Sequence, residues 1–320
     1  MVTISEGKLK SLEAVSDKNG VIRAAAMDQR GSLQKSIAKA KGINDKEVTP
    51  AMMSEFKTTV TKVLTPHATA ILLDPEYGLE AARQRSKNAG LLLAYEKTGY
   101  DASGPGRIPD FIEGYSARRI KEAGADCVKV LLYYTPFEDA KVNEKKHQIM
   151  ERIGKECEEA DIAFFLEFVG YDPKGGDEKG LEYAKLKPEI VIKSMEEFSK
   201  DKYKVDVLKV EIPVNVKFLK GSKAFNGKEA AYDREEAKAI FKRQDKCTSK
   251  PFIYLSAGVS DDVFRESLEL ATEAGVKYNG VLCGRATWKE GIPVYAKSGV
   301  KALESWLSDR GLQNIQALNK

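Results

Sequence analysis

The chain has 320 residues, of which 42% are hydrophobic and 31% charged, and this much apolar material excludes a mostly disordered protein. Its 52 Lys and Arg residues and 48 Asp and Glu residues nearly balance and are spread along the chain, so neither nucleic acid nor an anionic membrane is expected as the main partner. No apolar run is long enough to span a membrane, the N-terminus lacks the apolar core of a secretory signal, and the four cysteines form no CxxC pair. We therefore expect a cytoplasmic protein with reduced thiols.

Eight short runs of apolar, β-branched or aromatic residues follow one another along the chain. The runs are continuous rather than alternating, which is typical of parallel strands covered on both faces. Helix-like stretches separate most of them, and eight strand–helix units predict a (β/α)₈ TIM barrel, which we expect to form one domain over residues 1–320. The predicted strands lie at residues 21–27, 69–74, 90–96, 126–134, 161–169, 206–214, 251–259 and 279–286.

Start and stop signals mark the stretches between these runs. A Thr–Pro pair opens one stretch, Ser and Asp open another, and two stretches end on Gly. The terminal segments also look helical, and we expect them to cover the ends of the barrel. The predicted helices lie at residues 48–64, 79–88, 108–124, 144–160 and 260–275, with the terminal segments at 1–20 and 300–320.

Charged residues interrupt several of the predicted strands. Lys129, Glu167, Lys209 and Glu211 lie within the apolar runs, and Asp28 directly follows the first run. In a TIM barrel the active site forms at the C-terminal ends of the strands, so each of these residues is a candidate. Side chains alternate along a strand and must point either into the barrel or toward the helices, and an unpaired ion is costly in both places.

Two interpretations account for these charges. They form buried structural ion pairs, such as Lys129 with Glu167, or they carry out a reaction, which their number favours. A nucleophilic lysine must be neutral part of the time, and desolvation and a neighbouring cation favour this. Lys129 would be that cation beside Lys209, and Glu167 would move the protons of carbinolamine dehydration. The pattern therefore indicates Schiff-base chemistry.

The last two predicted strands end in residues suited to an anion. The seventh run ends with Ser256, Ala257 and Gly258, and the eighth with Gly284 and Arg285. TIM barrels often bind phosphate between the loops that follow these two strands. Glycine permits close backbone approach, and the arginine fork can donate two parallel hydrogen bonds. These residues together predict a phosphorylated substrate.

Segments over nearly the whole chain resemble class I tagatose-1,6-bisphosphate aldolases. The first strand, AAAMDQRGSL, and the loops at 135–142 and 171–180 depart from the family pattern, which leaves the substrate range open because loops at strand ends set such preferences. The segments that carry the resemblance include MDQRG at 27–31, ILLDPEYGL at 71–79, GLLLAYEKTGYD at 90–101, DVLKVEIPVN at 206–215, YLSAGVS at 254–260 and GVLCGRATW at 280–288.

The resemblance implies an enzyme that cleaves tagatose 1,6-bisphosphate reversibly to dihydroxyacetone phosphate and glyceraldehyde 3-phosphate, without a metal or other cofactor. Such enzymes serve lactose or galactose use and are usually oligomeric, often dimers. The resemblance implies these roles: Lys209 forms the Schiff base, Glu167 is the general acid/base, Lys129 is a second active-site lysine, Asp28 handles substrate hydroxyls, Gln29 touches substrate, and Ser256, Gly258, Gly284 and Arg285 bind a substrate phosphate.

Three alternatives stay open at this point. An aldolase for another ketose phosphate, such as sulfofructose 1-phosphate, would keep the same residues. A metal-dependent aldolase needs several histidine ligands, whereas the chain has only His67 and His147. A non-catalytic sugar-phosphate sensor would be expected to lose the lysine or the carboxylate, and both are present.

Several further residues have no settled role. Glu211 is either a helper that tunes Lys209 or a simple partner for it. Tyr133 or Tyr134 lines the site unless both are core residues, and Cys283 is expected in the core. We expect His67 at a helix cap or on the surface and give His147, on an exposed-looking helix, no role. Arg30 and the loop lysines are candidates for holding a second phosphate.

Overall fold

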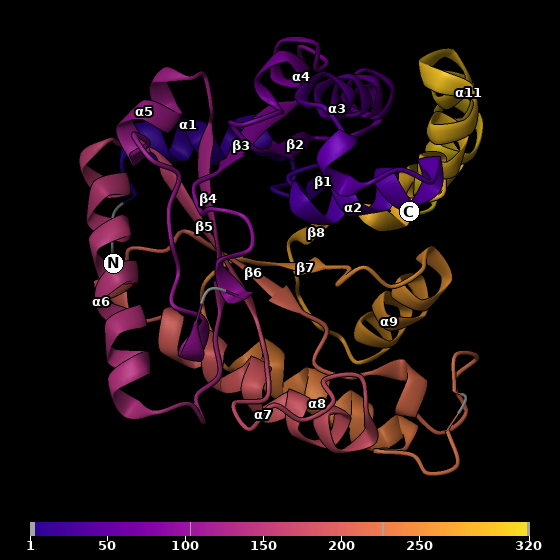
Figure 1. Ribbon diagram of the computed structural model, residues 1–320. Helices are drawn as coiled ribbons and strands as arrows, with labels where there is room; N and C mark the ends of the chain where they lie inside the picture. The colour runs from indigo at the N-terminus through magenta and orange to yellow at the C-terminus, as the bar shows by residue number, and fades with distance from the viewer. Residues whose placement is uncertain (1–3, 103, 226, 319–320) are drawn as a thin grey trace.

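Eight parallel strands close into a barrel in sequence order, with β1 paired to both β2 and β8 (Figure 1). The structure is a computed structural model that describes residues 4–102, 104–225 and 227–318. It confirms the predicted TIM barrel, and each of the eight predicted runs contains one strand. The strands are β1 (Ile22–Ala26), β2 (Ala70–Leu73), β3 (Gly90–Ala94), β4 (Cys127–Tyr133), β5 (Ala163–Val169), β6 (Val207–Glu211), β7 (Phe252–Leu255) and β8 (Gly280–Cys283).

Alternation along the strands divides the apolar residues into two cores. One cluster fills the inside of the barrel and includes Cys127, Phe165 and Val207, whereas their neighbours on the strands pack outward against the helices. Because side chains alternate, Lys129, Glu167 and Lys209 continue the inward-facing rows two residues further along each strand. The barrel interior is therefore apolar toward the N-terminal ends of the strands and ionic at their C-terminal ends.

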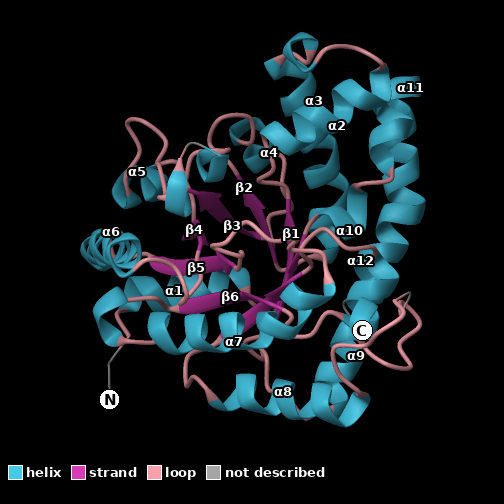
Figure 2. Ribbon diagram, turned by 60° about the horizontal axis from the view of Figure 1, so that its bottom comes forward, coloured by secondary structure: helices cyan, strands magenta, loops and turns pink. Residues whose placement is uncertain are grey.

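Helices surround the barrel (Figure 2). The helix predicted to start with Thr–Pro does so: the side chain of Thr49 accepts a hydrogen bond from the amide of Met52, and Pro50 occupies the first turn. The helices are α1 (Glu6–Val15), α2 (Gly31–Lys41), α3 (Pro50–Leu64), α4 (Leu79–Arg83), α5 (Ala117–Glu122), α6 (Ala140–Glu159), α7 (Leu181–Phe198), α8 (Arg234–Lys246), α9 (Asp261–Glu273), α10 (Arg285–Trp288), α11 (Gly291–Trp306) and α12 (Leu312–Leu318).

The helix predicted at 108–124 is much shorter than expected. Only α5 is helical there, because Gly114 has a φ of 75° and Ser116 then caps a new helix by accepting a hydrogen bond from the amide of Arg119. Phe111 instead forms an isolated antiparallel bridge with Glu96. This segment therefore contacts the chain just after β3, at the end of the barrel that carries the ionic groups.

The two terminal segments pack differently from each other. Helix α1 covers the N-terminal end of the barrel, where Ser11 accepts hydrogen bonds from the amide of Ala163 and the thiol of Cys127. Helix α11 packs against α2 and α3 in the outer layer, and α12 contacts α3 and α10, the short helix that follows β8. The C-terminal segment is therefore helical, as expected. Residues 1–3 and 319–320 of these segments lie outside the described residues.

Within the described part of the chain, no helix is both long and apolar enough to cross a membrane.

Gly280 is required where β8 closes the barrel against β1. Its φ is +123°, and a Cβ there would lie 1.9 Å from the carbonyl oxygen of Ile22.

We expect Gly280→Ala to lower the free energy of unfolding by about 4 kcal/mol, because both the backbone conformation and the strand contact are lost. Gly20→Ala is the control, since Gly20 has a φ of +75° but no atom within 4 Å of the added Cβ. It should cost about 1 kcal/mol. Equal losses in urea unfolding would contradict this account of closure.

Candidate active site

A cavity of about 540 Å³ opens at the C-terminal ends of the strands. It is bounded by the ends of β1, β4, β5, β6, β7 and β8 and by the loop after β3. Eight of the nine predicted site residues line it, and the ninth, Lys129, is fully buried beside it. The eight are Asp28, Gln29, Glu167, Lys209, Ser256, Gly258, Gly284 and Arg285.

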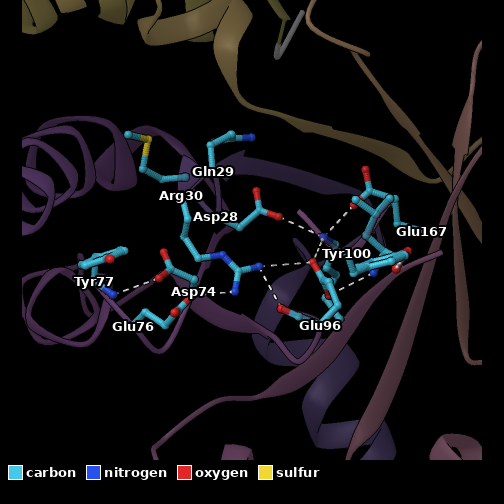
Figure 3. Close-up of polar contacts among 12 residues, drawn as sticks. Asp28, Gln29, Arg30, Asp74, Glu76, Tyr77, Glu96, Tyr100 and Glu167 are labelled. Carbon is cyan, nitrogen blue, oxygen red and sulfur yellow. Dashed lines mark hydrogen bonds and ion pairs between the residues drawn. The ribbon is translucent and has the colours of Figure 1, made fainter. Parts of the chain in front are cut away.

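Lys129 binds three carboxylates at once. Its Nζ lies 2.9 Å from Oδ2 of Asp28, 2.8 Å from Oε1 of Glu96 and 2.9 Å from Oε2 of Glu167. Figure 3 shows the carboxyl groups of Asp28, Glu96 and Glu167 arranged around one point, which this ammonium occupies. An ammonium has three N–H donors, so Lys129 uses all of them on acceptors from three different strand ends.

The charges of this cluster stabilise one another's ionised forms. Burial alone would lower the pKa of Lys129, but Asp28, Glu167 and Glu96 outweigh it and hold that pKa well above its ordinary value. Burial would likewise raise the pKa of Asp28, yet Lys129 and Lys209 hold it well below the usual carboxyl range. The same two lysines lower the pKa of Glu167 against the effect of its burial. The cluster therefore holds an ammonium and carboxylates at neutral pH.

Glu167 links the two lysines of the site. Its Oε2 lies 2.8 Å from Nζ of Lys209 and 2.9 Å from Nζ of Lys129. Glu167 and Lys209 are directly paired across β5 and β6, so the strand register itself places them side by side. Lys209 therefore contacts a carboxylate, and Lys129 contacts that carboxylate in turn. This carboxylate can accept a proton from one nitrogen while it stays bound to the other.

Glu96 belongs to the cluster and is not among the predicted site residues. It is buried, accepts a hydrogen bond from the amide of Leu131 as well as from Lys129, and its backbone carbonyl accepts one from Arg30. Glu96 ends the predicted run at 90–96 and lies four residues after the inward-facing Leu92. The signal that identified Lys129 and Glu167, a charge at the end of an apolar run, was therefore present here too.

Arg30 is held by protein carboxylates at the edge of the cavity. Its guanidinium donates to Glu76 over 2.9 Å and lies 3.8 Å from the carboxylate of Glu96 (Figure 3). The side chain is only 4% exposed. These contacts occupy a residue that the sequence left open as a phosphate ligand. Lys35 and Lys97 also line the cavity and are exposed, and Lys97 pairs with Asp110 over 3.1 Å.

The predicted phosphate-binding residues lie together at one side of the cavity. Ala257 and Gly258 have φ values of 48° and 74°, so the chain turns sharply after β7. The guanidinium of Arg285 packs onto this turn, and a Cβ at Gly258 would lie 2.6 Å from its Cζ. A Cβ at Gly284 would lie 2.9 Å from the carbonyl oxygen of Ala26. Both glycines are therefore needed for this arrangement, and Arg285 remains exposed toward the cavity.

Glu211 does not pair with Lys209. Its carboxylate lies 3.1 Å from Nζ of Lys187 on α7 and accepts a hydrogen bond from the amide of Gly170 over 2.8 Å. The interpretation of Glu211 as a simple partner of Lys209 is therefore wrong, because α7 supplies another cation. This ion pair ties the loop after β5 to β6 and α7, next to the cavity.

Neither histidine lies in the cavity lining. His147 is half-buried on α6, where its ring contacts Tyr134 at 3.0 Å and packs near Phe198, and burial lowers its pKa. This side of α6 is therefore not exposed, contrary to the expectation from the sequence.

Tyr133 lines the cavity, whereas Tyr134 is buried beside His147. Among the described residues, no three His, Cys, Asp or Glu side chains are placed to hold a metal ion.

Proteins of known name match this chain over its full length. The chain is 52% identical over its full length to tagatose 1,6-diphosphate aldolase 2 of Enterococcus faecalis, covering 95% of that protein. It is 51% identical, again over its full length, to a tagatose 1,6-diphosphate aldolase of Listeria monocytogenes, covering 93% of it.

Solved structures share the fold at low sequence identity. A fructose-bisphosphate aldolase from Plasmodium falciparum aligns over 97% of this chain and 92% of its own, with a TM-score of 0.63 and 13% identity. A Schiff-base-forming fructose-1,6-bisphosphate aldolase aligns over 92% and 96%, with a TM-score of 0.54 and 13% identity. The pattern of the DeoC/LacD family aldolases matches residues 22–290. Together with the full-length relatives, this match shows that the chain belongs to the DeoC/LacD aldolase family.

Proposed function

We propose that the chain is a class I aldolase that cleaves tagatose 1,6-bisphosphate reversibly to dihydroxyacetone phosphate and glyceraldehyde 3-phosphate. The observation that carries the proposal is Glu167, whose Oε2 touches both Lys209 and Lys129 at the floor of the cavity. Schiff-base formation requires a nucleophilic amine and an adjacent group that accepts and returns protons, and here Lys129 stabilises the ionised form of that group. The names of the Enterococcus and Listeria relatives support tagatose 1,6-bisphosphate as the substrate.

Schiff-base formation uses Lys209 and Glu167. The ammonium of Lys209 gives a proton to Glu167 over their 2.8 Å contact, and the free amine attacks the C2 carbonyl of the ketose. The resulting carbinolamine loses its hydroxyl group as water when Glu167 returns a proton to that oxygen. An iminium cation forms between C2 and Nζ. Lys129 stabilises the carboxylate of Glu167 whenever it is ionised.

Carbon–carbon cleavage follows from the iminium. A base takes the proton of the C4 hydroxyl, the C3–C4 bond breaks, and its electron pair moves into the iminium to give an enamine while the aldehyde leaves. Protonation of C3 and hydrolysis of the iminium then release dihydroxyacetone phosphate and regenerate Lys209. The electron sink is the protein's own iminium, so the proposal includes no metal and no other cofactor.

The rim of the cavity supplies substrate contacts. Ser256, Gly258, Gly284 and Arg285 bind the phosphate next to the Schiff base, with the Arg285 fork as the charged donor. Asp28 and Gln29 bind substrate hydroxyls; Oε1 of Gln29 is buried without a hydrogen-bond partner and is thus available to a donor. Lys35 of α2 and Lys97, which follows β3 and pairs with Asp110 at the surface, are the proposed cations for the second phosphate.

The cellular setting of the proposal rests on chemistry and sequence. The substrate and products are small sugar phosphates, which agrees with a cytoplasmic enzyme of lactose or galactose use. The four cysteines are free thiols, three of them buried, as expected for a reducing compartment. A homodimer is the proposed assembly, as in the family that the sequence resembles.

Borohydride trapping tests the reaction. We expect dihydroxyacetone phosphate and borohydride, in excess EDTA, to give a reduced adduct that peptide mass mapping places on Lys209. Lys209→Met should give no adduct, and Lys97→Met, which removes another cavity lysine, should still give one. An adduct on Lys129 would overturn the assigned roles, and a folded protein that gives no adduct would overturn the class I mechanism.

Cleavage assays then test the substrate. Tagatose 1,6-bisphosphate should be cleaved to the two triose phosphates, and sulfofructose 1-phosphate should be a poorer substrate. Trapping without cleavage of either compound would favour the sugar-phosphate sensor.

Arg285 should contribute to phosphate binding and not to the chemistry. A charge-assisted hydrogen bond contributes about 1.5–3 kcal/mol, so Arg285→Ala should raise KM for the bisphosphate by about 10- to 100-fold. Trapping with unphosphorylated dihydroxyacetone should be unchanged in this variant, because that ligand has no group for Arg285 to bind. Equal losses with the phosphorylated and unphosphorylated ligands would contradict the assignment.

A further inference from the structure

A fully buried ion pair lies behind the turn that carries Asp28 and Gln29. Lys57 comes from α3, Asp74 directly follows β2, and both side chains are 0% exposed. Nζ of Lys57 lies 2.5 Å from Oδ2 of Asp74, and it donates to the carbonyl oxygens of Met27 over 2.5 Å and Gln29 over 2.8 Å. All three N–H donors of this ammonium are therefore used.

These contacts fix the turn on both sides of Asp28. One nitrogen binds the carbonyl groups of the residues before and after it, and the amide of Met27 donates to the carbonyl of Leu72 over 2.7 Å. The carboxyl group of Asp28 is then left to face the cavity and to contact Lys129 over 2.9 Å. Asp74 is itself fixed, because its Oδ1 accepts a hydrogen bond from the amide of Tyr77 (Figure 3).

Stability alone does not account for an ion pair in this place. Desolvation of two fully buried charges costs several kcal/mol per ion, and well-packed apolar residues often stabilise a protein as much or more. Neither Lys57 nor Asp74 is among the residues that line the cavity. Lys57 donates hydrogen bonds to the two carbonyls that flank Asp28, and Asp74 accepts its third hydrogen bond; an apolar pair could do neither.

We propose that Lys57 and Asp74 are a positioning pair for the reaction: they hold the turn at residues 27–29 so that Asp28 meets Lys129 and Gln29 meets substrate. The inference rests on the proposed function for the roles of Asp28 and Gln29. Because misplacement of a catalytic group by about 1 Å can cost 10²-fold in rate, the pair acts on kcat without touching substrate.

The test compares three variants of the full-length protein. Lys57→Met removes the donor, and Lys57→Met/Asp74→Leu removes both charges and so avoids an unpaired buried carboxylate. Lys8→Met is the matched control: Lys8 of α1 binds Asp206 over 2.8 Å and is 9% exposed, at the opposite end of the barrel. For each variant, the melting temperature and the kcat and KM of bisphosphate cleavage are measured on folded protein.

We expect Lys57→Met to lower kcat by about 10- to 100-fold, with a smaller change in KM. The double variant should recover melting temperature relative to Lys57→Met but keep the low kcat, because the two carbonyls still lack a donor. Lys8→Met should lose melting temperature and keep kcat within about 3-fold of the wild type. Recovery of kcat together with melting temperature in the double variant would overturn the positioning role.

The outcome separates the inference from the proposed function. If the wild type and Lys8→Met both cleave the bisphosphate, the proposed function stands, and equal kcat values for Lys57→Met and Lys8→Met would overturn the positioning pair alone. If the wild type cleaves no ketose bisphosphate and gives no borohydride adduct, the proposed function is overturned first.

Discussion

The ammonium of Lys129 is buried inside the β-barrel, toward the C-terminal ends of the strands. The organisation of the site depends on how its charge is balanced. Removing such an ion from water costs several kcal/mol, which the protein offsets only if every N–H finds an acceptor. Asp28, Glu96 and Glu167 provide those acceptors from the ends of β1, β3 and β5. Lys209 then binds the same oxygen of Glu167, Oε2, that Lys129 binds. One desolvated cation thus brings together carboxylates from strands that are far apart in the sequence.

The two ends of the barrel serve different purposes. At the N-terminal end, α1 and the close contact of Gly280 with Ile22 seal an apolar interior. At the C-terminal end, the same inward-facing rows carry ions, and the loops form an open cavity. Lys57 and Asp74 line neither the cavity nor the apolar interior of the barrel. They join the outer helix α3 to the turn that carries Asp28. The ionic end is thereby supported from outside the barrel.

Much of this arrangement could be predicted from the sequence, because period-two alternation fixes which strand residues face inward. Lys129, Glu167 and Lys209 were identified as charges within apolar runs, and the same signal at the end of the run at 90–96 would have identified Glu96. Alternation placed each charge on one face of its strand, and the structure shows that this face is the inner one. The ion pair of Lys57 and Asp74 could not be predicted, since it depends on how α3 lies against the ends of β1 and β2. Glu211 shows the same limit: its partner, Lys187, comes from α7. The helix expected at 108–124 was too long because Gly114 and Ser116 together start a new helix at Ala117.

The central claim is that the carboxylates of Asp28, Glu96 and Glu167 hold Lys129 as an ammonium. The most direct measurement is an NMR titration of the protein with ¹³C at the lysine ε carbons, in which Lys129→Arg identifies the Lys129 signal by its loss. The account predicts that this signal keeps the position of an ammonium up to pH 10.5, the ordinary pKa of lysine, because the pKa of Lys129 is raised. A titration step of that signal below pH 10.5 would contradict the account, since Lys129 would then be neutral where the cluster requires its charge.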